Sequence, residues 1–105
     1  MKLAIFFKES KNYSFYTEIE IKKFILEVQE NFKLILKNKY LILNDNDKYY
    51  SFFAIFDKLE IYFHYWERVG TGYVELLGDL DLFKVWDLLK EKIQPKYWNV
   101  TLYED

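Results

Sequence analysis

The sequence predicts an α+β fold, a largely antiparallel sheet in the order β-α-β-β-β-β-α-β with two helices packed on one face. Three observations lead to this prediction. Aromatic and β-branched residues, which suit the pleated and half-buried surface of a strand, dominate residues 49–66. Two other segments space their apolar residues as amphipathic helices do, each behind a capping residue. A length of 105 residues corresponds to a single domain, residues 1–105.

The first strand and the first helix have clear start signals. Residues 2–7 (KLAIFF) are a short apolar run, which predicts a strand that is buried on both faces and lies in the interior of the sheet. Thr17 and Glu20 then have the spacing of a capping box, which marks the start of a helix. The apolar stripe behind them predicts a helix over residues 18–37.

The end of this helix has two interpretations, because periodicity cannot assign short apolar runs. In the first, the helix continues to residue 37 and a strand follows over residues 40–43. In the alternative, the helix ends near Asn31 and residues 33–44 form a hairpin that turns at Asn38-Lys39. The longer helix is preferred because the helical pattern is sustained over more residues.

A central hairpin is predicted next. Residues 44–47 (NDND) form a turn, because Asn and Asp bond their own backbone there. Residues 49–66 then divide at Asp57-Lys58 into two runs of strand length. Alternation along the second run predicts a core face and a partly wet face. The core face holds Leu59, Ile61, Phe63 and Tyr65, and the wet face holds Glu60, Tyr62, His64, Trp66 and Arg68.

A further strand is predicted over residues 73–77, after a turn at Gly70-Thr71. If this is a two-residue turn, the register across it follows directly. It pairs Arg68 with Tyr73, Trp66 with Glu75, and His64 with Leu77.

The second helix and the last strand complete the chain. Either Asp79 or Asp81 can cap the helix, and Pro95 ends it. A strand is expected over residues 98–103. The buried stripe of the helix is predicted to be Leu82, Val85, Trp86, Leu89 and Ile93.

Composition and charge exclude several classes of function. There is no cysteine, so disulfides, thiol chemistry and cysteine zinc sites are excluded. The first ten residues lack the features of a secretory signal, and no apolar run approaches the ~20 residues of a membrane span, so we expect a cytoplasmic protein that does not contact a membrane. The net charge is −2, and residues 51–105 carry ten acidic against six basic side chains. An acidic half argues against direct binding of nucleic acid and suits a basic protein partner.

Motifs for catalysis or metal binding do not emerge. His64 is the single histidine, and no nucleophile or metal-ligand motif accompanies it. The acidic pair at Asp45 and Asp47 fits a turn, and the pair at Asp79 and Asp81 fits helix capping. The first pair also lacks the glycine and the distal glutamate of a calcium loop. We therefore expect no catalytic residue, no cofactor and no metal.

These features favour a small acidic binding protein. The leading hypothesis is an immunity protein that neutralises a cationic bacterial toxin, a nuclease, by occluding its active site; it rests on this general character alone. One alternative is a phage-encoded inhibitor of a host defence nuclease, such as an anti-CRISPR, and another is a small enzyme that uses His64. The oligomeric state stays open. The expected partner-binding residues are Glu60, Tyr62, His64, Trp66, Tyr73, Glu75, Asp79 and Asp81.

Overall fold

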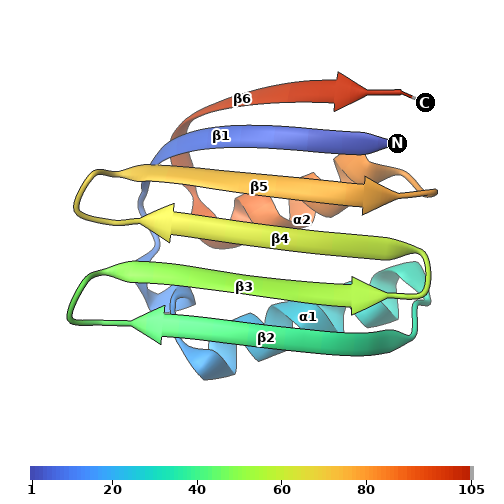
Figure 1. Cartoon of the computed structure of the whole chain (residues 1–105), viewed down its shortest axis with the longest axis horizontal. Coiled ribbons are helices and arrows are strands. Elements are labelled where there is room, and N and C mark those ends of the chain that lie inside the picture. Colours follow the sequence, from blue (N-terminus) through green and yellow to red (C-terminus); the bar gives the residue numbers. More distant parts are fainter. Residues whose placement is uncertain (105) are drawn as a thin grey trace.

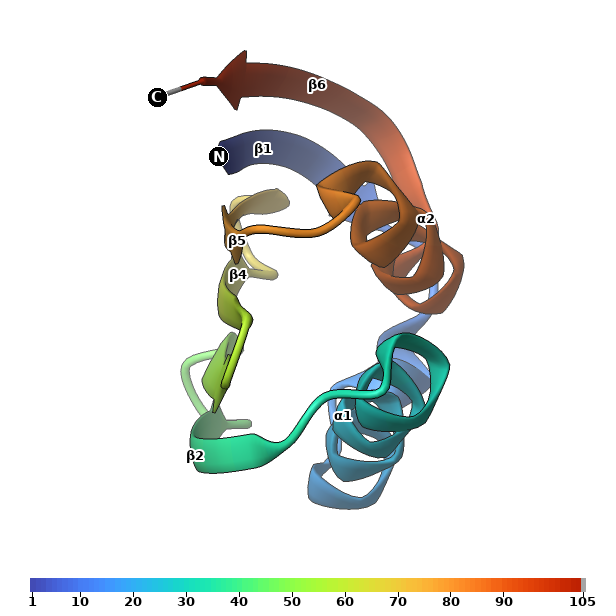
Figure 2. The ribbon, with the colours of Figure 1, turned by 90° about the vertical axis from the view of Figure 1, so that its right-hand side faces the viewer.

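The computed structural model, which describes residues 1–104, confirms the predicted α+β fold and the predicted order of its strands and α-helices. A six-stranded sheet has the strand order β2-β3-β4-β5-β1-β6, and every neighbouring pair is antiparallel (Figure 1). Both helices lie on one side of this sheet (Figure 2). The elements are β1 Lys2–Ser10, the 3-10 helix η1 Tyr13–Phe15, α1 Glu18–Phe32, β2 Leu36–Asn44, β3 Tyr49–Phe56, β4 Leu59–Trp66, β5 Thr71–Gly78, α2 Leu82–Ile93 and β6 Pro95–Tyr103.

The core lies between the helices and the sheet, and β4 runs through its centre. The predicted core face of β4 is confirmed, because Leu59, Ile61, Phe63 and Tyr65 are all at most 2% exposed. Gly72 of β5 contributes to the same packing. A Cβ atom at Gly72 would collide with the ring of Phe7, its partner on β1, so only glycine at this position leaves room for the ring.

The end of α1 corrects both interpretations of residues 31–44. Thr17 caps the helix as predicted, accepting a hydrogen bond from the Glu20 backbone N–H. The helix then stops at Phe32, and Lys33 takes a left-handed conformation with φ 54°. The longer helix is therefore wrong. The alternative end of the helix, near Asn31, is confirmed to within one residue, but the alternative hairpin is wrong because Asn38 lies inside one continuous strand, β2. As a strand, this segment pairs with β3 from Leu36 to Asn44 and covers an edge that β3 would otherwise expose.

The position of β1 confirms one expectation and corrects another. β1 lies between β5 and β6, in the interior of the sheet as predicted. It is not buried on both faces, since Phe6 is 59% exposed while its neighbours Ile5 and Phe7 are buried. The reason is that the helices cover only one side of the sheet, so an interior strand can still carry an exposed ring (Figure 2).

The register between β4 and β5 also differs from the prediction. The chain turns over four residues from Glu67 to Gly70 instead of two, and Gly70 takes a left-handed conformation with φ 72°. Its backbone N–H donates to the Trp66 carbonyl at 2.8 Å. β5 consequently starts at Thr71, two residues earlier than expected. The longer turn pairs Trp66 with Thr71, His64 with Tyr73, Tyr62 with Glu75, and Glu60 with Leu77.

The structure selects Asp81 as the cap of α2. Its carboxylate accepts a hydrogen bond from the Phe83 backbone N–H at 3.2 Å. α2 ends at Ile93, Gln94 is left-handed with φ 48°, and β6 starts at Pro95 rather than at residue 98. All five residues of the predicted buried stripe of this helix are buried.

Candidate binding face

The side of the sheet opposite the helices is the candidate site, and we call it the open face (Figure 2). It consists of the side chains that alternate with the buried ones along each strand. Trp66 is 42% exposed on it, and Tyr40 and Tyr97 near its two edges are 57% and 60% exposed. The centre of the open face is formed by Glu60, Tyr62, His64, Trp66, Tyr73 and Glu75, which belong to β4 and β5.

A group of polar and aromatic side chains surrounds His64. The pairing of β3 with β4 places Tyr49 opposite Trp66 and Ser51 opposite His64. The His64 Nδ1 lies 3.0 Å from the Tyr49 hydroxyl and 3.1 Å from the Ser51 hydroxyl. The Tyr49 ring is 5.2 Å from the Trp66 ring, and the His64 ring stacks 5.8 Å from it. Trp66 therefore packs against two neighbouring rings on the surface.

Two tyrosine–glutamate pairs lie beside this group. The Tyr62 hydroxyl donates to Glu60 Oε1 at 2.6 Å, and the Tyr73 hydroxyl donates to Glu75 Oε1 at 2.6 Å. Burial, together with the hydrogen bond to Glu75, raises the pKa of Tyr73 to about 12. The same bond, helped by Lys2, lowers the pKa of Glu75 despite its partial burial. Hydrogen bonds from the two tyrosines therefore position both carboxylates, and the lowered pKa of Glu75 keeps that carboxylate charged at neutral pH.

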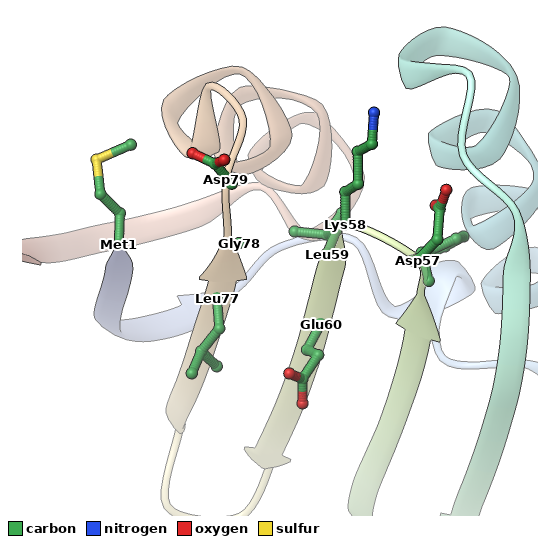
Figure 3. A pocket seen from close by; sticks show the side chains of 9 residues that line it. Met1, Asp57, Lys58, Leu59, Glu60, Leu77, Gly78 and Asp79 are labelled. Carbon is green, nitrogen blue, oxygen red and sulfur yellow. The ribbon is translucent and has the colours of Figure 1, made fainter. Parts of the chain in front are cut away.

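The structure brings six of the eight expected partner-binding residues together and places the other two elsewhere. Asp81 is engaged as the cap of α2. Asp79 lies at the end of β5, where it lines a depression of about 710 Å³ together with Asp57, Lys58 and Glu60 (Figure 3). In Figure 3, Lys58 stands between Asp57 and Asp79 at the strand ends, while Glu60 lies further along β4. We call this the acidic depression; Glu60 connects it to the open face.

Two lysines of the open face are not among the residues predicted from the sequence. Lys2 and Lys8 are the open-face neighbours of Leu77 and Thr71 on β5, and the Lys2 Nζ lies 3.3 Å from Glu75 Oε2. Alternation along the first strand carries a signal for them, because Lys2, Phe6 and Lys8 fall on one face. The open face thus mixes both signs of charge, and the lining of the acidic depression has three carboxylates beside Lys58 and the amino terminus at Met1.

The contacts of His64 resemble those between a nucleophile and its base, since a serine hydroxyl faces an imidazole nitrogen. Ser51, however, is only 9% exposed. Glu75, the nearby carboxylate, is engaged by Tyr73 and Lys2. In a catalytic triad, the histidine contacts the nucleophile with one ring nitrogen, and a third group that orients the ring bonds the other nitrogen, which for His64 would be Nε2. The contacts that are present join the His64 Nδ1 to the hydroxyls of Tyr49 and Ser51.

His64 makes the stability of the fold depend on pH. Burial lowers the pKa of His64 below its ordinary value of 6.5, and the Glu75 carboxylate offsets this only in part. At pH values just below 6.5, His64 is protonated in the unfolded chain but stays neutral in the folded state. The free energy of unfolding therefore decreases as the pH falls through 6.5. Chemical melts between about pH 7.5 and pH 5 should show wild type losing more stability than His64→Gln. Parallel curves would contradict the assignment.

Two further observations concern residues 1–104. Within this range, histidine and carboxylate side chains do not gather in groups of three or more that could hold a metal ion. Helices in the same range are too short or too polar to cross a membrane.

Comparison with known proteins adds no family assignment. A scan against protein-family models and a search of curated proteins found no match to this sequence.

Proposed function

We propose that this protein is a binding protein that neutralises a cationic protein, a nuclease toxin, by covering its active site with the open face. The observation that carries the proposal is Trp66, a large ring that is 42% exposed on an uncovered sheet. Large apolar groups gathered on a surface mark interaction sites. Tryptophan and tyrosine are also the residues that most often dominate binding energy at protein interfaces.

The contacts among the side chains of the open face support this role. Trp66 is held by Tyr49 and His64, and Tyr62 lies 6.2 Å from the Phe53 ring. Side chains that are fixed before binding lose little conformational entropy when the partner arrives. A surface of this kind can bind without rearrangement of its backbone.

The charges support a basic partner. The active site of a nuclease holds phosphate with lysine and arginine side chains. One such side chain entering the acidic depression would meet the carboxylates of Asp57, Asp79 and Glu60. Trp66 lies at the other end of β4, so a partner that spans the sheet along this strand would contact both.

The direct test is capture of the partner from the native host. Immobilised wild-type protein should retain a basic protein that a Trp66→Ala variant does not retain. If wild type and Trp66→Ala retained the same proteins in equal amounts, the role of the open face would be contradicted. A toxin gene adjacent to this gene would indicate an immunity protein, whereas a phage operon would indicate the inhibitor of a host defence nuclease, which would use the same face.

Reversing the central charges should slow association. Glu60→Lys and Glu75→Lys replace carboxylates that attract a basic partner, so we expect the association rate to fall more than the dissociation rate rises. The association rate of wild type should also fall steeply with added salt. Surface plasmon resonance at two ionic strengths measures both effects. Glu30→Lys makes the same charge change on α1, on the other side of the molecule, and should leave the rates unchanged; an equal effect there would indicate a net-charge effect only.

The contact between Ser51 and His64 keeps an enzyme as the second candidate function. It can be separated from binding by one variant. If the open face acts by occlusion, His64→Ala should still neutralise the partner, with affinity reduced only through looser packing of Trp66. Complete loss of function with unchanged binding affinity would favour catalysis by His64.

A further inference from the structure

The two edges of the sheet differ in how they are protected. β2 and β6 are the edge strands, and an edge presents unpaired backbone groups that another strand can bond (Figure 1). β2 carries two protective features, the exposed lysines Lys37 and Lys39 and a break in register between Leu36 and Asn38. Lysines and bulges are the usual means by which edges avoid pairing. β6 has a proline and a lysine only at its start, Pro95 and Lys96, and the rest of the strand has no such protection.

β6 is long and uncharged along most of its length. Residues 97–103 (YWNVTLY) contain no charged side chain, no proline and no glycine. Its inner side pairs with β1 from Lys2 to Ser10, so the outer side offers a regular row of donors and acceptors. Large side chains are exposed on both of its faces, with Tyr97 at 60%, Trp98 at 48% and Tyr103 at 54%. An edge with these properties pairs with another strand or aggregates.

We propose that β6 pairs antiparallel with β6 of a second copy, with the two-fold axis at Val100. Such a pairing joins the six strands of each copy into one continuous sheet and closes the assembly, since the remaining outer edges are the two protected β2 strands. Tyr97 then faces Tyr103, Trp98 faces Leu102, Asn99 faces Thr101, and Lys96 faces Glu104 of the second copy.

A second copy of this chain is the proposed partner because the two side chains in each of these pairs are compatible. The sequence around Val100 is complementary to itself when reversed, with rings opposite rings and apolar residues opposite apolar residues. Lys96 and Glu104, both exposed, add opposite charges at each end of the ladder. Lys96 already lies 3.4 Å from Glu9 on the same molecule, and the carboxylate of Glu104 would complete its surroundings.

Charge substitutions on the exposed side of β6 test the pairing. Wild type should show a reversible monomer–dimer equilibrium in sedimentation experiments. The double variant Asn99→Glu with Thr101→Glu places carboxylates opposite each other across the two-fold axis and should weaken the dimer by about tenfold or more. The double variant Asn99→Lys with Thr101→Lys should do the same, and an equal mixture of the two should form heterodimers. Circular dichroism controls for folding, since both positions are exposed.

Disulfide trapping tests the register. The chain has no cysteine, so any disulfide in a single-cysteine variant must join two copies. Val100→Cys places two thiols opposite each other and should cross-link faster than Asn99→Cys, whose thiols lie diagonally. Equal rates, or faster cross-linking at Asn99, would overturn the proposed register. A wild type that stays monomeric at the highest attainable concentration would overturn the proposal and leave β6 to a strand from a different protein.

Discussion

Phe63→Ala is expected to lower the free energy of unfolding by about 3–5 kcal/mol, the usual effect of removing a fully buried aromatic ring. Phe63 is 0% exposed. Its ring stacks 4.9 Å from Phe52 and lies 5.8 Å from Phe7 and 6.4 Å from Phe15. Rings from two other strands and from η1 therefore lose a shared partner, and a cavity remains among them. A domain of this size has only about 5–15 kcal/mol in total, so the variant should be close to unfolding.

Phe6→Ala is the matched control. It removes the same ring from the opposite face of the sheet, where Phe6 is 59% exposed. Its expected effect in a chemical melt is below about 1 kcal/mol, because an exposed ring leaves no cavity. If Phe63→Ala proved as mild as Phe6→Ala, the assignment of the two sheet faces would be reversed.

Trp66→Ala is expected to weaken partner binding by about 2–4 kcal/mol, roughly thirtyfold or more, while the fold stays intact. The ring is exposed at the end of β4 and contacts Tyr49 and His64, so its removal takes away the anchor and frees its two neighbours. Isothermal titration with the captured partner measures the affinity. The melting temperature of the free protein should change little.

Phe83→Ala controls for the loss of exposed aromatic surface as such. Phe83 is 47% exposed, close to the 42% of Trp66, but it belongs to α2 on the other side of the sheet. Binding should be unaffected by this variant. Equal losses in the two variants would mean that the open face is not the binding surface, and a loss in Phe83→Ala alone would move the site to the helices.

The site could be predicted only in part. Alternation along β4 was sufficient to place Tyr62, His64 and Trp66 on one surface, because successive side chains of a strand point to opposite faces. To predict which of these residues pair with Tyr73 and Glu75, one must know the length of the turn that ends at Gly70. A turn of four residues instead of two shifts the partner strand without changing which face its side chains occupy. The expected residues of β4 and β5 were therefore assigned to the correct face although their pairing was not, whereas Asp79 and Asp81 lie off this face.

The sequence by itself determined the elements whose signals are local. The alternation of residues 59–66, the helix cap at Thr17 and the buried stripe of α2 all depend on residues close in sequence, and all appear in the structure. Tertiary structure alone decided the rest. The apolar residues after Phe32 satisfy a helix and a strand equally well, and only the open edge of β3 selects a strand. Likewise, Lys2 meets Glu75 because β1 enters the sheet beside β5, a pairing between distant segments that no local pattern encodes.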